Sequence, residues 1–362
     1  MNLSLYLICH HGHWDDFRRD ARFIQRVSLE KKIPITYFFS GIELRALLDN
    51  RDRIGRELWI DLVGGMQGVD FINPRFGYNN PHLSEIGGMT FNHVPLVQPW
   101  FHDQREYLEG ILPEQIQRTL DIARYDFNKP IVTFHGPDGV YSPAVAYKLR
   151  EHGLDAVIIS SEFLGDDRRA KGFLYWASGL RHLVRTNDIQ LQDKKFWRAS
   201  DFIDATQTYG HQYDIPFVVV GCDIDEVNGT REMSIEDGVA RLGCIGDEAY
   251  RRGMKIVNCN AASHWNSKHR NIEDIWPWDN VYAMQNGHGD LSWIIRDRNG
   301  EVGHVVWLIG ERHKQGEDVR AAKEHLYLAT DSACRHKNYG YNQFLTDLFN
   351  YNIGKARELL KG

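Results

Sequence analysis

The sequence predicts an α/β fold built on parallel strands, in the form of an α/β barrel with a helical region attached. Residues 3–9, 33–39 and 215–220 are continuous apolar runs, which are typical of strands buried on both faces. Residues 131–159 follow the order strand, polar loop, helix, strand. A chain of 362 residues exceeds the usual size of one domain and fits such a barrel with an additional unit.

Composition narrows the class of protein. The sequence is 42% hydrophobic and 25% charged, which is ordinary for a soluble globular protein. The formal net charge is −6 and no long Lys/Arg cluster is present, so we expect no nucleic-acid partner. No apolar run approaches about 18 residues, and the first nine residues lack a basic start and a cleavage site, so we expect no membrane partner and a cytoplasmic location.

The side chains available for chemistry are histidines, aromatics and carboxylates rather than cysteines. The five cysteines are scattered and odd in number, with no Cys-x-x-Cys pair, which favours reduced, mostly buried thiols. The 17 histidines and 12% aromatic residues are unusual. Imidazoles and flat rings supply the hydrogen bonds and stacking that a polyhydroxylated ligand needs, so some of them should line a site.

The first predicted strand delivers a polar cluster at its carboxyl end. Residues 3–9 run into His11, His13 and Asp15, and a helix follows to about residue 31. Two histidines with nearby carboxylates can contact substrate, or they can hold a divalent metal such as zinc. Simple polar packing at the sheet edge is the third interpretation.

The central stretch places Asp138 in a loop after the strand at residues 131–134. Ser142-Pro143 then opens a helix that ends at Gly153. In parallel α/β folds, ligands bind at the carboxyl ends of strands. A carboxylate between a proline and a glycine and close to His135 is poorly explained by packing, although a loop or capping role is the plain alternative.

A second acidic group closes a late strand. Residues 215–220 end at Asp223, Asp225 and Glu226. Three carboxylates in four residues repel one another, which raises the pKa of at least one and suits a proton donor. A calcium site, or an acidic start to the helix at 234–252, is the alternative.

The remaining elements follow the same reasoning. We predict helices at 42–50 and 112–125, strands at 174–176 and 180–185, and an irregular segment at 186–197. Gly64-Gly65 and residues 73–81 indicate a loop insertion. A strand at 255–258 should bring Ser263, His264 and Trp265 to another strand end. The pattern is helical from 319 onward, and we predict a catalytic barrel at 1–266 and a mainly helical region at 267–362.

Several of these stretches resemble glycoside hydrolase family 57. Residues 135–160 resemble the nucleophile region of the family, and they read HGPDGVYSPAVAYKLREHGLDAVIIS. Residues 85–96, EIGGMTFNHVPL, resemble its second motif, whose histidine corresponds to His93. The His-x-His pair at 11–13, the Asp-x-Asp pair at 223–225 and the segment LATDSAC at 328–334 resemble further family elements. Residues 33–48 are similar both to this family and to polysaccharide deacetylases, which share an incomplete barrel of seven strands.

The resemblance implies an incomplete (β/α)7 barrel with a C-terminal helical region, and a retaining α-glycosidase or glucanotransferase that needs no cofactor. Asp138 would be the nucleophile and Asp223 the general acid/base acting on an oligo- or polysaccharide. The substrate-binding residues would be His11, His13, His93, His135, Asp225 and Trp265. The family usually has Glu at the nucleophile position, and the shorter Asp138 would place its oxygen about 1 to 1.5 Å farther from the anomeric carbon. A carboxylate gap of about 6.5 to 9.5 Å would predict inversion instead.

Two other functions compete with this interpretation. A metal-dependent deacetylase would hold a divalent metal such as zinc on His11, His13, Asp15 and His93, and a bound water would attack an acetyl carbon. The Thr-Phe-Asp-Asp-Gly and His-x-x-x-His elements of that group are absent from the sequence. A catalytically inactive carbohydrate-binding homologue is the third hypothesis.

Overall fold

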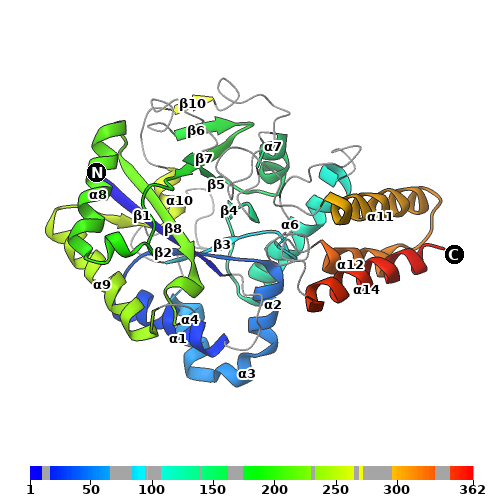
Figure 1. The fold of residues 1–362 in the computed structure, drawn as a ribbon, viewed down its shortest axis with the longest axis horizontal. Helices are drawn as coiled ribbons and strands as arrows, with labels where there is room; N and C mark the ends of the chain where they lie inside the picture. The colour runs from blue at the N-terminus through cyan, green and yellow to red at the C-terminus, as the bar shows by residue number, and fades with distance from the viewer. Residues whose placement is uncertain are drawn as a thin grey trace.

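Seven parallel strands form the centre of the molecule, and helices surround them (Figure 1). The computed structural model describes residues 1–9, 17–65, 84–93, 96, 107–137, 141–142, 144–161, 174–229, 233–264, 269–271, 296–330 and 343–361. The strands are β1 (Asn2–Cys9), β2 (Ile35–Phe39), β3 (Glu85–Gly88), β4 (Thr133–His135), β5 (Ala156–Ser160), β6 (Leu174–Ala177), β7 (Leu180–Arg185), β8 (Phe217–Asp223), β9 (Ile256–Val257) and β10 (His269–Asn271).

The parallel strands close into a ring in the order β1, β2, β3, β4, β5, β7, β8, with β8 pairing back to β1. Closure between β7 and β8 depends on one register pair, Arg185 with Val219, next to which the Thr186 amide donates to the Val219 carbonyl at 3.0 Å. The short β9 pairs with the start of β1, and β6 forms an antiparallel hairpin with β7. The predicted incomplete (β/α)7 barrel is confirmed.

The pleat of β1 explains why its sequence is apolar throughout. Leu3, Leu5 and Leu7 belong to the large core between the ring and its helices. Tyr6 belongs to a smaller cluster inside the ring, which also contains Phe38, Val219 and Val257. Successive side chains of a strand point to opposite faces, so a strand with apolar surroundings on both sides needs apolar residues at nearly every position.

The helices largely follow the strands in sequence. They are α1 (Phe17–Gln25), α2 (Gly41–Asp49), α3 (Arg51–Ile54), α4 (Arg56–Gly65), α6 (Leu112–Asp121), α7 (Ala144–Glu151), α8 (Ala199–Tyr213), α9 (Ile235–Arg251), α10 (Cys259–Ser263), α11 (Arg296–Lys314), α12 (Arg320–Ala329) and α14 (Gln343–Leu359). Short π-helical turns lie at Arg26–Glu30, Tyr107–Ile111 and Ile122–Asp126, and 3-10 turns lie at Lys194–Phe196 and at Ile224–Glu226, which is η8.

Two predictions about local structure were wrong. Gly64-Gly65 ends α4 and does not form a loop insertion, because Leu62 and its neighbours pack that helix against the outer core. Ser263 lies in α10 and not at a strand end, because the Asn258 side chain accepts a hydrogen bond from the Ala261 amide at 2.8 Å and starts a helix directly after β9. Residues 73–81 lie outside the described part of the chain.

Helix α10 closes the amino-terminal end of the barrel. The Cys259 amide donates to Thr36 Oγ1 at 2.8 Å, and the Asn260 amide donates to Glu85 Oε1 at 3.0 Å. Thr36 Oγ1 also donates to Glu85 Oε1 at 2.7 Å. Glu85 is 1% exposed, so this carboxylate is a structural group that hydrogen bonds stabilise inside the barrel.

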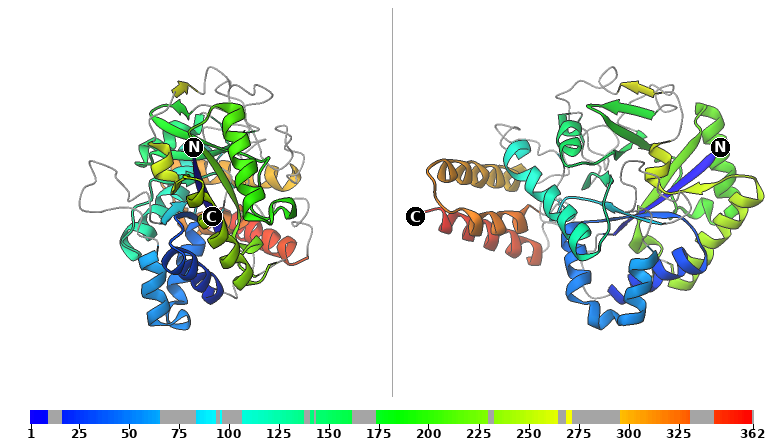
Figure 2. Two further views of the ribbon diagram at one scale, coloured as in Figure 1. Left: turned by 90° about the vertical axis from the view of Figure 1, so that its left-hand side faces the viewer. Right: turned by 180° about the vertical axis from the view of Figure 1, so that it is seen from behind.

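The C-terminal helices α11, α12 and α14 pack on one another and extend away from the barrel beside α6 (Figures 1 and 2). Polar contacts join α12 to α6: the Tyr327 hydroxyl donates to Glu114 Oε2 at 2.6 Å, and Arg118 pairs with Glu324 at 3.0 Å. Strand β10 lies beyond residue 266 and pairs with β6, so the sheet continues past the predicted domain boundary. The division at residue 266 stays a prediction.

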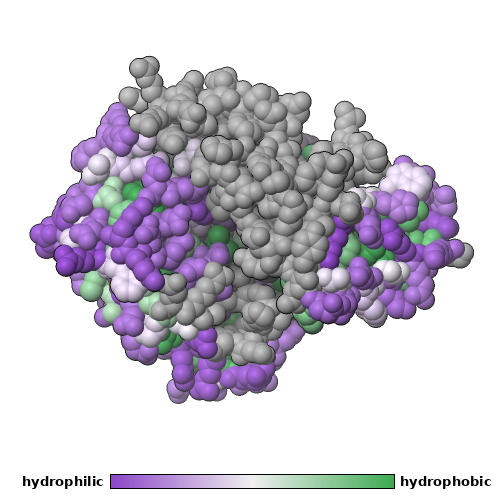
Figure 3. Space-filling model, viewed as in Figure 1, coloured by the Kyte–Doolittle hydropathy of each residue, from purple (hydrophilic) through white to green (hydrophobic). Residues whose placement is uncertain are grey.

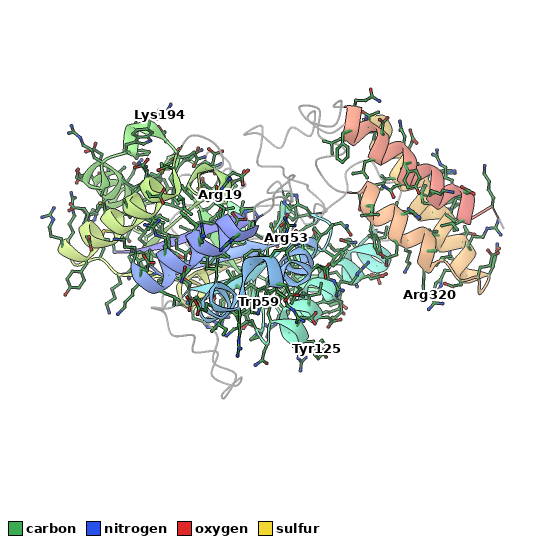
Figure 4. All side chains as sticks on the ribbon, turned by 90° about the horizontal axis from the view of Figure 1, so that it is seen from below. Arg19, Arg53, Trp59, Tyr125, Lys194 and Arg320 are labelled. Carbon is green, nitrogen blue, oxygen red and sulfur yellow. The ribbon has the colours of Figure 1, made fainter. Side chains whose placement is uncertain are left out.

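The outer surface fits this arrangement. On the face in Figure 3, the described surface of the barrel helices is mainly hydrophilic, and apolar side chains show among the C-terminal helices. Viewed from below, Trp59 and Tyr125 lie on barrel helices, whereas Arg320 marks the separate helical group (Figure 4). Within the described residues, every helix is too short or too polar to cross a membrane.

Candidate active site

Asp223 lies at the carboxyl end of β8 and faces the inside of the ring. Phe217 and Val219 belong to the inner cluster, and alternation along the strand places Gly221 and Asp223 on the same face. Phe217 to Cys222 are buried, whereas Asp223 is exposed. The strand is longer than the predicted 215–220 and carries the candidate acid as its last residue, so this carboxylate is accessible where parallel α/β folds bind ligands.

Other carboxylates gather around the carboxyl end of β1. Asp225 and Glu226 lie half-buried on η8, directly after Asp223. Burial raises the pKa of the Cys9 thiol well above its ordinary value, and negative charge raises it further. The contributing carboxylates, in decreasing order, are Asp20, Glu43, Asp225 and Asp223. The predicted acidic group is therefore one part of a wider negative region.

His135 ends β4 on the inner face and lies below the barrel mouth. It is 2% exposed and packs against Tyr6 and Phe38, with ring centroids 5.5 and 5.4 Å away. Burial lowers the pKa of His135 to about 3, the positive charge of Arg185 lowers it too, and the Gly136 backbone opposes the shift. The imidazole is therefore neutral at physiological pH, so it can serve as a hydrogen-bonding group but not as a cation.

His93 lies in the turn after β3, and its backbone is in the left-handed region with φ of 52°. Such a conformation is uncommon for a residue with a Cβ, and it persists where the surrounding structure fixes the turn. Gln115 of α6 fixes the two residues before His93: the Phe91 amide donates to the Gln115 carbonyl at 3.0 Å, and the Asn92 amide donates to Gln115 Oε1 at 2.8 Å. Helix α6 thus fixes the direction of the chain at His93.

Sequence reasoning missed one residue of this region, Arg185. It ends β7, and Leu183 of the same strand belongs to the inner cluster, so Arg185 also faces inward. Arg185 is 8% exposed; its Nη1 donates to Tyr6 Oη at 2.8 Å and its Nε donates to Asn187 Oδ1 at 2.9 Å. Its position as the last residue of a predicted strand was a signal, but the sequence did not show which face it occupied.

The remaining site predictions fall outside the described residues. These are His11, His13, Asp15, Asp138 and Trp265. His264, which precedes Trp265, lies 3.5 Å from Arg181 near the start of β7, at the amino-terminal end of the barrel. In the described part of the chain, no three His, Cys, Asp or Glu side chains form a group that could hold a metal. The metal hypothesis on His11, His13, Asp15 and His93 stays a prediction.

Three solved structures share the fold of this chain. The chain is similar to a 4-α-glucanotransferase from Thermococcus litoralis, with a TM-score of 0.67 and 14% identity over 99% of this chain and 60% of that chain. It is similar to the α-amylase AmyC from Thermotoga maritima, with a TM-score of 0.64 and 11% identity over 99% of this chain and 93% of that chain. An exo-type maltose-forming amylase from a Pyrococcus species matches with a TM-score of 0.56 and 15% identity, over 100% of this chain and 72% of that chain.

No protein-family model and no curated protein sequence matches the chain. The chain spans about 60% of the length of the glucanotransferase that it matches. At these identities the likeness establishes the fold. The chain therefore has the barrel fold of the family 57 glycoside hydrolases that its motifs resemble.

Proposed function

We propose that the protein is a carbohydrate-active enzyme, a retaining α-glycosidase or glucanotransferase that acts on an oligo- or polysaccharide. The observation that carries the proposal is the placement of Asp223: an exposed carboxylate on the inner face of a seven-strand barrel, at the carboxyl end of β8. The amylases and the glucanotransferase that share this barrel support a glucan as the first substrate to test.

In this mechanism one carboxylate forms a covalent bond to the sugar and the other transfers a proton. Asp138 attacks the anomeric carbon while Asp223 gives its proton to the departing oxygen, so the glycosidic bond breaks as the bond to Asp138 forms. Asp223 then removes a proton from water or from an acceptor hydroxyl, which attacks the same carbon and releases Asp138. Two carboxyl groups that work in this way lie about 5 to 5.5 Å apart.

The histidines have different parts in this proposal. His93, aimed by its fixed turn, binds a sugar hydroxyl, as do His11 and His13. His135 is too deeply buried to stack on a sugar ring. Its neutral imidazole instead lies beneath the site and can offer a hydrogen bond from there. Asp225 and Glu226 add negative charge next to Asp223, which favours retention of the proton that Asp223 must donate.

The test is product analysis with the full-length chain on malto-oligosaccharides. Proton NMR of the first product reports the anomer: retention supports attack by Asp138, whereas inversion indicates a wider gap with an intervening water. Asp138→Asn and Asp223→Asn should each lower the rate of product formation by about 10²-fold or more. Asp247→Asn is the matched control, because Asp247 is an exposed carboxylate on α9 away from the barrel mouth.

Two outcomes would replace the proposal. Release of acetate from acetylated sugars, lost to a chelator and restored by zinc, would establish the metal-dependent deacetylase. Sugar binding that survives both aspartate substitutions, with no product from the parent chain, would establish a binding protein.

A further inference from the structure

Arg185 is a buried cation without a carboxylate partner among the described residues. Its hydrogen bonds go to neutral oxygens, those of Tyr6 and Asn187, and no described Asp or Glu lies within ion-pair distance. Asn187 is itself fixed, since its Nδ2 donates to Ser160 Oγ at 2.9 Å. A buried charge is costly unless other charges compensate it, so the position of this guanidinium calls for an explanation beyond packing.

The guanidinium lies just beneath the level of the candidate acid. Tyr6, which receives the hydrogen bond from Arg185, is opposite Gly221 in the register of β1 and β8. The Tyr6 ring packs so closely on Gly221 that an added Cβ would lie 2.4 Å from it. Asp223 is two residues farther along the same strand face, a rise of roughly 7 Å. The hydrogen bond from Arg185 to Tyr6 therefore lies near the level of Gly221, two residues below Asp223 along β8.

The titratable groups around Arg185 come from several elements. Two of them feel its charge directly: it lowers the pKa of His135, and it opposes the rise in the pKa of buried Cys222 that desolvation, Asp223 and Glu226 cause. Among the described residues, the groups facing this region are Tyr6 from β1, His135 from β4, Cys222 and Asp223 from β8, Asp225 and Glu226 from η8, and Cys259 from α10, while Arg241 of α9 acts on Cys222 from the outer side. The carboxylates of this set lie above the cation, at the carboxyl end of β8 and on η8.

We propose that Arg185 is a positioning residue of the active site: a fixed cation below its floor that balances the carboxylates at the barrel mouth and sets the pH range in which the site works. This inference rests on the proposed function. Tyr6 and Asn187 hold the charge in one place, and an arginine keeps its charge at every working pH. Burial, with a smaller contribution from the same charge, lowers the pKa of His135 and keeps it neutral, so the floor carries one positive group and not two.

A purely structural role would predict different behaviour. Arg241 is a buried arginine with such a structural role. It is 9% exposed, and its Nη2 donates to the carbonyls of Leu191 and Phe196 at 2.7 and 3.0 Å. Those bonds tie α9 to the segment after β7 on the outer side of the ring. Loss of Arg241 should lower stability and leave the pH dependence of the site unchanged.

The experiment measures the charge at Arg185 in two independent ways. The first is the NMR titration of the His135 imidazole in the full-length chain, whose signal is identified by its loss in His135→Gln. Arg185→Met should move this titration to higher pH by about 1 unit, while burial still keeps it below the ordinary value. Arg185→Lys should restore it largely, and Arg241→Met should not move it. An unchanged titration in Arg185→Met overturns the proposal.

The second measurement is the pH profile of kcat/KM on malto-oligosaccharides. Removing a positive charge makes every nearby carboxylate hold its proton more tightly, so both limbs of the profile should move to higher pH by about 1 unit in Arg185→Met. Arg185→Lys and Arg241→Met should keep the parent limbs. A fall in kcat/KM at all pH values without a shift of the limbs indicates a structural role only and contradicts the inference.

Two provisions keep the test decisive. If Arg185→Met does not fold, Tyr6→Phe removes one of the two anchors while keeping the ring, and a smaller shift in the same direction is expected. If the parent chain binds malto-oligosaccharide without turnover, the proposed function fails, and the pH dependence of Kd replaces that of kcat/KM. The His135 titration then still decides whether Arg185 supplies the floor charge.

Discussion

The two ends of the barrel use the same kind of side chain for opposite purposes. At the amino-terminal end, Glu85 is buried and accepts hydrogen bonds from Thr36 and from the backbone of α10. At the carboxyl end, Asp223 is exposed and follows a strand whose other residues are buried. A carboxylate in a barrel is therefore structural or functional according to the donors that surround it and the access that water has, and its identity as an acid does not decide which.

The largest expected effect is the loss of activity in Asp223→Asn. An amide of the same shape cannot donate the proton, so kcat/KM on malto-oligosaccharides should fall by about 10² to 10⁴-fold. Because Asp223 is exposed, the midpoint of thermal unfolding should stay close to that of the parent. A variant that unfolds easily but keeps its turnover would reverse the contrast between the two ends.

Glu85→Ala should do the converse. It leaves the Asn260 amide without its acceptor inside the barrel, and the free energy of unfolding should fall by about 3 kcal/mol in urea titration. Glu85→Gln keeps one acceptor oxygen and should lose less. If Glu85→Ala instead abolished activity with no loss of stability, the amino-terminal carboxylate would be functional.

His135 lies between the two ends and sharpens the comparison through pH. Its pKa is about 3 in the folded state, below the ordinary value of 6.5. The unfolded chain therefore takes up a proton first as the pH falls below 6.5, and this group's contribution to stability is lost progressively from there toward pH 3. Between pH 6.5 and 5 the loss should be about 2 kcal/mol, measured by urea unfolding. His135→Gln should remove that part of the pH dependence, and an equally steep profile in His135→Gln would contradict the assignment.

The smallest expected effect concerns the fit inside the ring. Gly221→Ala places a methyl group against the Tyr6 ring, which Phe38 and His135 hold from other sides, so the free energy of unfolding should fall by about 1 to 2 kcal/mol. Gly354→Ala is the matched control, since nothing lies within 4 Å of that position on α14, and it should raise stability by up to about 1 kcal/mol. Equal effects of the two substitutions would show that the ring interior tolerates extra volume.

Strand positions were readable in the sequence because burial on both faces leaves little room for polar residues. β1, β2, β5 and β8 lie where mainly apolar runs predicted them, and β7 lies at the predicted residues 180–185. Helix α9 was equally clear, since Ser234 caps its start by accepting a hydrogen bond from the Asp237 amide. Patterns that arise from local capping or from two-sided burial depend on few distant contacts, and so they survive in the sequence.

Helices held by tertiary contacts were not readable. α8 contains threonines, a glycine and a histidine, and its buried Phe202 and Ile203 find their partners only when the barrel forms. α11 contains glycines and an asparagine around a short apolar run, which matches no regular period. Only the packing of distant segments decides these elements.

Part of the candidate site was predictable for the same reason. Asp223, Asp225 and His135 follow predicted strands, and the strand ends of a parallel barrel converge. The burial of His135 and the inward direction of Arg185 were not predictable, because both depend on which face of the strand meets the interior. A shift of one residue in register would exchange those faces.

The single backbone pairing that closes the ring involves Arg185, the same residue that carries charge to the floor. Its side chain reaches Tyr6 of β1, whose ring fills the space that Gly221 of β8 leaves open. One side chain thus links β7 to β1 and places a positive charge beneath the site. A substitution that removes this charge would also remove the hydrogen bond between β7 and Tyr6 of β1, so the acidity of the site and the side-chain link across the ring would change together.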